Sequence, residues 1–202
     1  MRLLLVAVLC LSLQISNGQE KSNFEKIDIE TMYQIESDNE SVFIDTVEFS
    51  LTLDNFSSSA QTKTKTYIFK RIHDDFTPKL HVWYHVDQKS NNIVAITYNW
   101  DFYNPSFNPD KNRELIFETI KRESEYQRKY QDINSVLKGI FTNPSKTNLI
   151  NDSDYSFNEM TYWENSKLYA YSRLRFQRKI DENPMIGLAN NHFVVQMVVS
   201  YK

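Results

Sequence analysis

Residues 81–100, HVWYHVDQKSNNIVAITYNW, are the stretch that decides the fold. Apolar residues occupy every second position at its start, with Val82, Tyr84 and Val86, and the alternation returns after a polar interruption at residues 87–92. A period of two predicts β-strands, because successive side chains of a strand point to opposite faces. The interruption consists of turn-forming residues. The stretch therefore predicts a β-hairpin with one apolar face and one face of imidazole, indole, hydroxyl and amide groups.

The apolar face of this hairpin is expected to pack on a long helix. The expected contacts join Val82, Tyr84, Val94, Ile96 and Tyr98 to Ile116, Ile120, Tyr130 and Leu137. A register slip of one residue would instead bury His81 and His85, and a buried polar group without a partner costs about 1–3 kcal/mol. On this interpretation Ile96→Ala destabilises the fold, whereas Thr97→Ala, on the opposite face, costs little.

Strand and helix patterns alternate along the rest of the chain. Strands are predicted over residues 41–53, 62–71, 155–163, 167–178 and 192–201. Asn108 and Pro109 suit the start of a helix that extends to about Phe141, where Asn143-Pro144 ends it. Residues 145–154 are expected to form a loop, and residues 19–40 a weakly structured arm or a short helix.

These elements predict an α+β fold: an antiparallel sheet with one long helix packed on one face. The sequence contains no visible internal repeat and no Pro- or Gly-rich linker. Residues 19–202 are therefore predicted to form a single domain.

The first 18 residues are typical of a secretory signal. Arg2 is followed by a short apolar run, and Ser16 and Gly18 provide small residues before an expected cleavage at Gln19. The single cysteine, Cys10, lies in this segment, so the mature chain is expected to lack disulfides. A cysteine-free exported domain of this size favours a bacterial envelope or secreted protein, in the periplasm or outside the cell. No later stretch is apolar enough to span a membrane as a helix.

Composition argues against several classes of function. The chain has three glycines, and one of them belongs to the predicted signal. Phosphate-binding loops, dinucleotide-binding turns and nucleophile elbows all require closely spaced glycines. The net charge of −3 is not that of a nucleic-acid-binding protein. No cofactor is therefore expected, and no nucleic-acid partner.

Histidine spacing suggests a metal site, but geometry argues against it. His81 and His85 have the four-residue spacing of helical zinc sites. In a strand, residues at this spacing lie about 13 Å apart and cannot bind one ion. We therefore predict no metal site and assign no catalytic residue.

The candidate binding surface lies in residues 167–179, KLYAYSRLRFQRK. Tyrosine and arginine alternate with apolar residues, which places them together on one face of a strand. Phenol and guanidinium groups suit carboxylates, phosphates or sugar rings. The predicted ligand-binding residues are Trp83, Tyr169, Tyr171, Arg173 and Arg175, with His81 and His85 expected on the same face.

Three functions are compatible with this pattern. The first is a non-enzymatic binding domain for a small anionic or glycan ligand, or for a protein partner. The second is an envelope hydrolase with a His–carboxylate site in which His85 is the base. The third is an assembly subunit that pairs with a partner through an exposed sheet edge.

Overall fold

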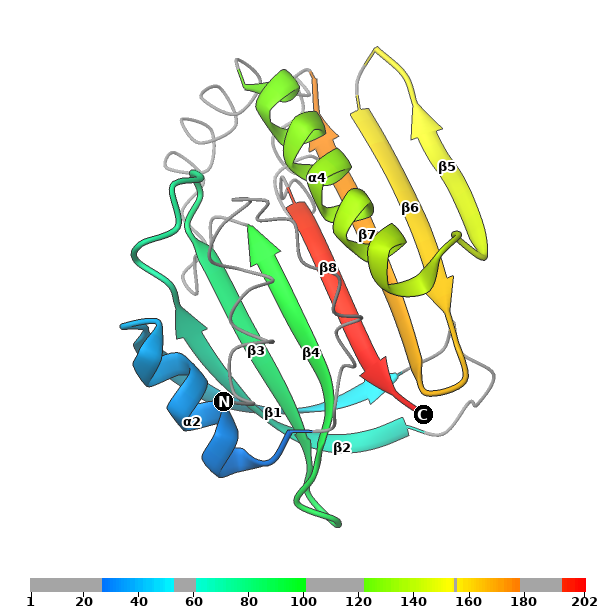
Figure 1. Ribbon diagram of the computed structural model, residues 1–202. Helices are drawn as coiled ribbons and strands as arrows, with labels where there is room; N and C mark the ends of the chain where they lie inside the picture. The colour runs from blue at the N-terminus through cyan, green and yellow to red at the C-terminus, as the bar shows by residue number, and fades with distance from the viewer. Residues whose placement is uncertain (1–26, 53–60, 101–121, 155, 179–193) are drawn as a thin grey trace, which may run out of the picture.

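The computed structural model describes residues 27–52, 61–100, 122–154, 156–178 and 194–202 (Figure 1). The helices are α2 (Ile29–Asp38) and α4 (Glu123–Phe141). The strands are β1 (Val42–Thr52), β2 (Gln61–Lys70), β3 (Leu80–Asp87), β4 (Ile93–Trp100), β5 (Lys146–Asp152), β6 (Ser156–Glu164), β7 (Leu168–Gln177) and β8 (Val194–Tyr201). They form one antiparallel sheet in the order β1-β2-β3-β4-β8-β7-β6-β5, which confirms the predicted sheet.

Two units of the same topology build this sheet. Each is a helix followed by a four-stranded meander, α2 with β1–β4 and α4 with β5–β8, and the last strands of the units pair with each other. The cross-strand pairings are those of a local two-fold axis that passes between Thr97 and Val198. This axis relates each residue of β4 to one residue of β8. The sequence contains no internal repeat that would predict this structural repeat. The pairing of β4 with β8 is called the seam below.

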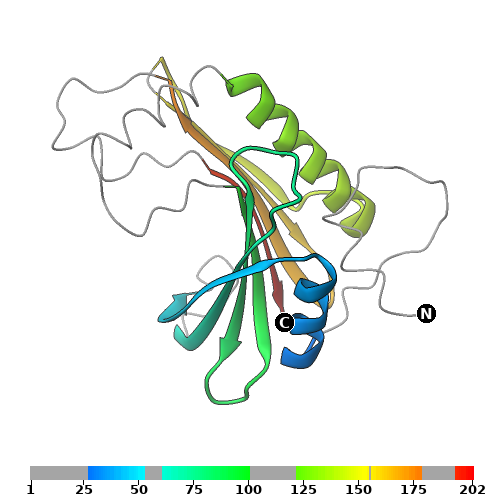
Figure 2. The same ribbon diagram turned by 90° about the vertical axis from the view of Figure 1, so that its left-hand side faces the viewer.

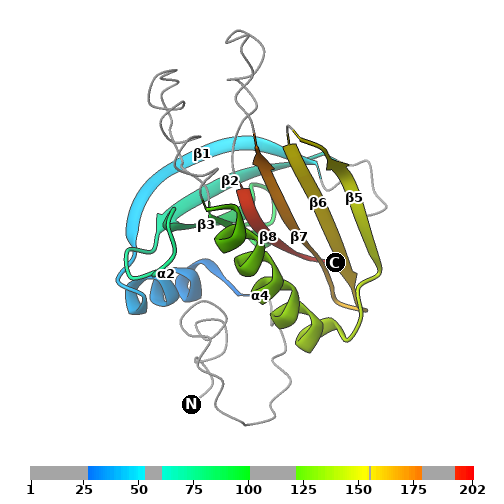
Figure 3. The ribbon, with the colours of Figure 1, turned by 90° about the horizontal axis from the view of Figure 1, so that it is seen from above.

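Both helices lie on the same face of the curved sheet (Figures 2 and 3). The prediction of one long helix on one face is therefore confirmed in part. α4 packs on β6, β7 and β8, whereas the predicted residues 109–121 lie outside the described ranges. A second helix, α2, forms where a weakly structured arm was the main expectation. Asp28 caps it by accepting a hydrogen bond from the Thr31 amide at 2.7 Å.

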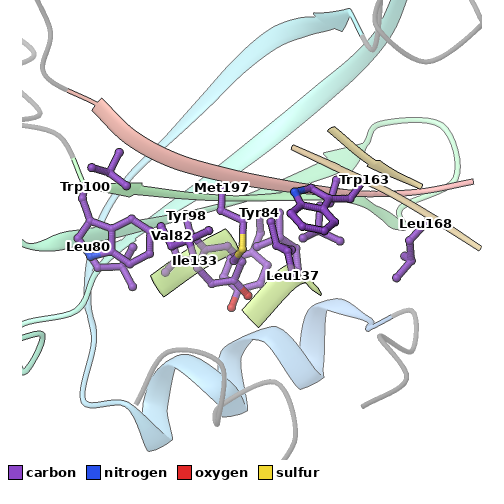
Figure 4. Packing of buried hydrophobic residues seen from close by; sticks show 14 of the residues in the cluster. Leu80, Val82, Tyr84, Tyr98, Trp100, Ile133, Leu137, Trp163, Leu168 and Met197 are labelled. Atoms are coloured by element: carbon purple, nitrogen blue, oxygen red, sulfur yellow. The ribbon is translucent and has the colours of Figure 1, made fainter. Parts of the chain in front are cut away.

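The core lies between the sheet and the two helices (Figure 4). The predicted members that it contains are Val82, Tyr84, Ile96, Tyr98, Tyr130 and Leu137. Ile116 and Ile120 lie outside the described residues. Val94 is half-buried and does not belong to the core, because a register shift pairs Val86 with Ile93 and leaves Val94 as the extra residue. Ile93 takes the core position that Val94 was expected to fill.

The prediction of a loop over residues 145–154 is wrong, because Lys146–Asp152 form the strand β5. It is an edge strand whose residues are nearly all exposed. The sequence Lys146-Thr-Asn-Leu-Ile-Asn-Asp152 has no apolar alternation, because neither face of this strand is buried against the core. Pairing with β6 makes it a strand.

The central strands are buried on both faces, which also departs from the prediction. The face opposite α2 and α4 is called the outer face. His81, His85 and Thr97 lie on it and are 7%, 2% and 5% exposed, although they were expected at the surface. Thr97 is therefore a buried residue, and we no longer expect its truncation to cost little.

No helix among the described residues combines the length and apolar character that a membrane crossing requires. The predicted signal at residues 1–18 lies outside the described ranges.

A buried ion pair fixes α2 to the sheet. Glu36 is 2% exposed, and its carboxylate accepts hydrogen bonds from Arg71 Nη2 and Tyr84 OH, both at 2.6 Å. Ser41 Oγ donates to the same carboxylate at 2.6 Å. Burial and the neighbouring Glu36 charge raise the pKa of Tyr84 well above its usual value, so its hydroxyl remains a donor. The helix, the end of β2 and the centre of β3 therefore meet at one carboxylate.

We expect this ion pair to behave as a unit. Arg71→Met should destabilise the protein by about 3–5 kcal/mol, because it leaves the Glu36 carboxylate buried without its cation. The double variant Glu36→Leu, Arg71→Met should be clearly more stable than Arg71→Met alone. Urea unfolding of the two variants checks this, and equal losses would show that the charge of Glu36 is not the cause.

The two faces of β4 should both respond to truncation. Ile96→Ala should cost about 2–5 kcal/mol through the cavity that it leaves in the core. Thr97→Val keeps the shape but removes the hydroxyl that bonds His85, and should cost about 1–3 kcal/mol. Thermal unfolding measures both losses, and a neutral Thr97→Val would show that the outer face is not tightly packed at the seam.

Candidate functional site

A row of polar side chains crosses the outer face at the seam. Its members are direct cross-strand partners on five neighbouring strands: Lys70, His81, Asn99, Gln196 and Arg173, in that order. They share the outer face because the alternate positions of the same strands, such as Phe69, Val82 and Tyr98, point into the core. This set, called the polar row, lies on the side of the sheet turned away from the viewer in Figure 1.

Arg173 supplies an uncompensated positive charge to the polar row. Its side chain is half-buried, and its Nε donates to Asn158 Oδ1 at 3.1 Å. It forms no ion pair with any residue that the structure describes. The terminal guanidinium nitrogens therefore keep donors for an external acceptor. Arg178, by contrast, is paired with both Glu123 and Asp152.

Asn99 supplies a buried acceptor two strand spacings away from this charge. The residue is 6% exposed, and its Oδ1 has no hydrogen-bond partner among the described residues. Nearly all buried polar side-chain atoms of proteins have a partner, so such an atom calls for an explanation. Trp163 Nε1 and Ser200 Oγ are also buried and lack a hydrogen-bond partner in the described part of the chain, but neither residue belongs to the polar row. Asn99 is set apart by its position, since Gln196 alone separates it from Arg173 across the sheet.

Gln196 lies between these two residues across the sheet. Its Oε1 accepts a hydrogen bond from the Tyr171 hydroxyl at 3.3 Å, which turns the amide oxygen towards β7. Burial raises the pKa of Tyr171 to about 12, against the opposing effect of the Arg173 charge, so the phenol stays protonated and donates. The amide nitrogen of Gln196 has no partner among the described residues and remains a donor.

Two aromatic residues flank the seam in the neighbouring row. Trp83, Thr97, Val198 and Tyr171 are consecutive cross-strand partners, so two short side chains separate the two large ones. Trp83 and Tyr171 occupy equivalent positions about the local two-fold axis, and both are half-buried. The strands that carry them are about 14 Å apart at the usual spacing of neighbouring strands.

His85 is held in a closed arrangement beside this row. Its Nδ1 and Nε2 lie 2.9 Å from the hydroxyl oxygens of Thr66 and Thr97. Burial lowers the pKa of His85 to about 4, so the ring is neutral at pH 7. Burial, aided by the positive charge of Lys70, lowers the pKa of His81 to about 4 as well.

The five predicted binding residues share the outer face, but only some of them come together. Tyr171 and Arg173 both lie beside Gln196, whereas β4 and β8 separate the strand of Trp83 from the strand of Tyr171. Tyr169 pairs with Ser200 across the sheet, close to the C-terminus, and Lys202 Nζ lies 4.2 Å from its ring centroid. Arg175 lies opposite Asn158 on β6, beyond the polar row.

Sequence reasoning missed Asn99, Gln196 and Lys70 as members of the site. Asn99 and Gln196 are polar residues inside strands that are otherwise mainly apolar, and this was the available signal. Their proximity was not accessible, because it depends on the pairing of β4 with β8.

The described part of the chain contains no group of three His, Cys, Asp or Glu side chains that could hold a metal ion. His73 contacts a carboxylate, that of Glu40 at 2.9 Å, but both side chains of this pair are largely exposed. The chemistry that the outer face offers is hydrogen bonding and charge pairing by Arg173, Gln196 and Asn99.

No family model matches this chain, and no curated protein or solved structure matches it either.

The buried histidines predict a specific acid sensitivity. Unfolding restores the pKa of His85 from about 4 to its usual value near 6.5, so the unfolded chain binds the proton more tightly. The unfolding free energy should fall as the pH drops from 6.5 to 4, by up to about 3 kcal/mol for this residue. In His85→Gln the unfolding free energy should depend less steeply on pH. Part of the dependence should remain, because His81 is still present. Urea unfolding across this range checks the prediction, and equal slopes for the two proteins would contradict it.

Proposed function

We propose that this chain is an exported, non-enzymatic binding domain that holds a small anionic ligand on the outer face of the sheet, at the seam. The observation that carries the proposal is a half-buried Arg173 with no acidic partner, two strand spacings from a buried Asn99 acceptor with no donor. Both absences hold for the residues that the structure describes. An anion would compensate the first group and a ligand hydroxyl or amide the second. Export rests on the signal-like sequence of residues 1–18.

The geometry of the outer face supports binding over catalysis. A general base must reach a substrate proton, but both nitrogens of His85 lie at hydrogen-bond distance from threonine hydroxyls and the ring is 2% exposed. Arg173 and Gln196 are both half-buried and accessible, and they offer donors and charge without a nucleophile.

Assembly through a sheet edge has less support. Exposed apolar residues on the edge strands favour it: Phe43 and Ile44 on β1, and Leu149 and Ile150 on β5. Both strands, however, contain a register shift at these residues, with Ile44 and Ile150 as the extra residues. Bulges of this kind interrupt the ladder and blunt an edge against pairing with another chain.

Removing the charge of Arg173 should abolish anion binding without unfolding the protein. The probes are acetate and inorganic phosphate, titrated into the labelled protein while the NMR signal of the Trp83 indole is followed. The wild-type chain should show a saturable shift, and Arg173→Gln should lose it because the guanidinium provides the attraction.

Arg128→Gln is the matched control, since it removes an equal charge from an exposed position of α4 on the opposite side of the sheet. This variant should bind like wild type, and all three proteins should melt at similar temperatures. No saturable shift in the wild-type protein, or an unchanged shift in Arg173→Gln, would overturn the proposed function.

A further inference from the structure

We propose that the ligand of the polar row is an acidic sugar, whose carboxylate pairs with Arg173 and whose ring hydroxyl donates to Asn99. This inference rests on the proposed function and specifies its ligand class. It starts from the order of the groups along the row: a cation at Arg173, an amide donor at Gln196 and a buried acceptor at Asn99. The ligand must therefore carry an anion at one end and a hydrogen-bond donor one to two strand spacings away.

A carboxylate matches the Arg173 end. The Nε of the guanidinium is occupied by Asn158, which orients the group and leaves the Nη donors for a planar acceptor. Two parallel bonds from a guanidinium to a carboxylate give direction as well as energy. The Gln196 amide nitrogen lies next in the row and can donate to the same ligand.

The donor that meets Asn99 should be uncharged. The polar row contains Lys70 and Arg173 but no acidic residue. An ammonium group would therefore meet two like charges and no counter-charge, which disfavours amino acids and other zwitterions. A hydroxyl or an amide N–H satisfies Asn99 Oδ1 without this repulsion.

The aromatic residues favour a sugar over a peptide. Trp83 and Tyr171 lie on either side of Thr97 and Val198 in the adjacent row, and both remain partly exposed. Small-ligand sites combine such apolar, aromatic surfaces with a few placed polar groups. A sugar acid presents C–H faces to the rings and hydroxyls to the amides within one compact molecule.

The test compares four probes by calorimetry: methyl β-glucuronide, methyl β-glucoside, acetate and an N-acetylated amino acid. The wild-type protein should bind the glucuronide at least about tenfold more tightly than acetate or the neutral glucoside, because only the glucuronide engages both Arg173 and Asn99. Glucuronide binding no tighter than acetate binding would overturn the sugar-acid inference and leave the anion site standing. No binding of any anion would instead overturn the proposed function.

Asn99→Leu separates the two contacts. This variant should lower glucuronide affinity about tenfold but leave acetate affinity unchanged, since acetate reaches only Arg173. Its melting temperature should equal or exceed that of wild type, because an unpaired buried acceptor is replaced by an apolar group of similar size. A lower melting temperature together with unchanged glucuronide affinity would show that Asn99 serves the fold and would overturn its role. Tighter binding of the N-acetylated amino acid than of the glucuronide would assign the site to peptide carboxylates instead.

Discussion

The pairing of β4 with β8 is the constraint on which the rest of the structure depends. It joins two helix–four-strand units into one sheet and makes their last strands the centre of the molecule. These two strands are buried on both faces, with Tyr98 and Val199 at 0% exposure towards the helices and Ser200 at 1% on the outer face. Burial on both faces stabilises the seam through apolar area, and it also fixes the register, because a slip by one residue would exchange the two faces.

Burial on both faces has a consequence for the polar residues of the seam. A buried polar group needs a hydrogen-bond partner, and His85 meets this requirement with the hydroxyls of Thr66 and Thr97. Asn99 does not meet it within the described chain, although it lies on the same outer face. The difference distinguishes a histidine whose ring nitrogens have partners from an amide oxygen that the described residues leave without one. It also explains why the candidate site takes residues from both units: Asn99 comes from the first, and Gln196 and Arg173 come from the second.

The sequence predicted the parts of the fold that a local period can encode. Alternation located every described strand except β5, and also the core face of Tyr84, Ile96 and Tyr98. It failed at β5, whose exposed faces leave no apolar pattern, and at Val94, where one extra residue reverses the alternation. It also predicted the shared face of Tyr171 and Arg173, but not that His81 and His85 are buried. The neighbourhood of Asn99 and Gln196 could not be predicted, because these residues are about one hundred positions apart and only the strand order brings them together.

The same topology that creates the central site leaves the sheet open at both ends. A seam formed by the last strands of both units places the first strands, β1 and β5, at the two edges. Open edges invite pairing with other chains, and each of these strands has a bulge at an exposed isoleucine, Ile44 or Ile150. The bulges limit extension of the ladder while the central rows keep regular pairing. The regular part of the sheet is thus the part that can hold Asn99, Gln196 and Arg173 at fixed spacing, as a binding site built on strands requires.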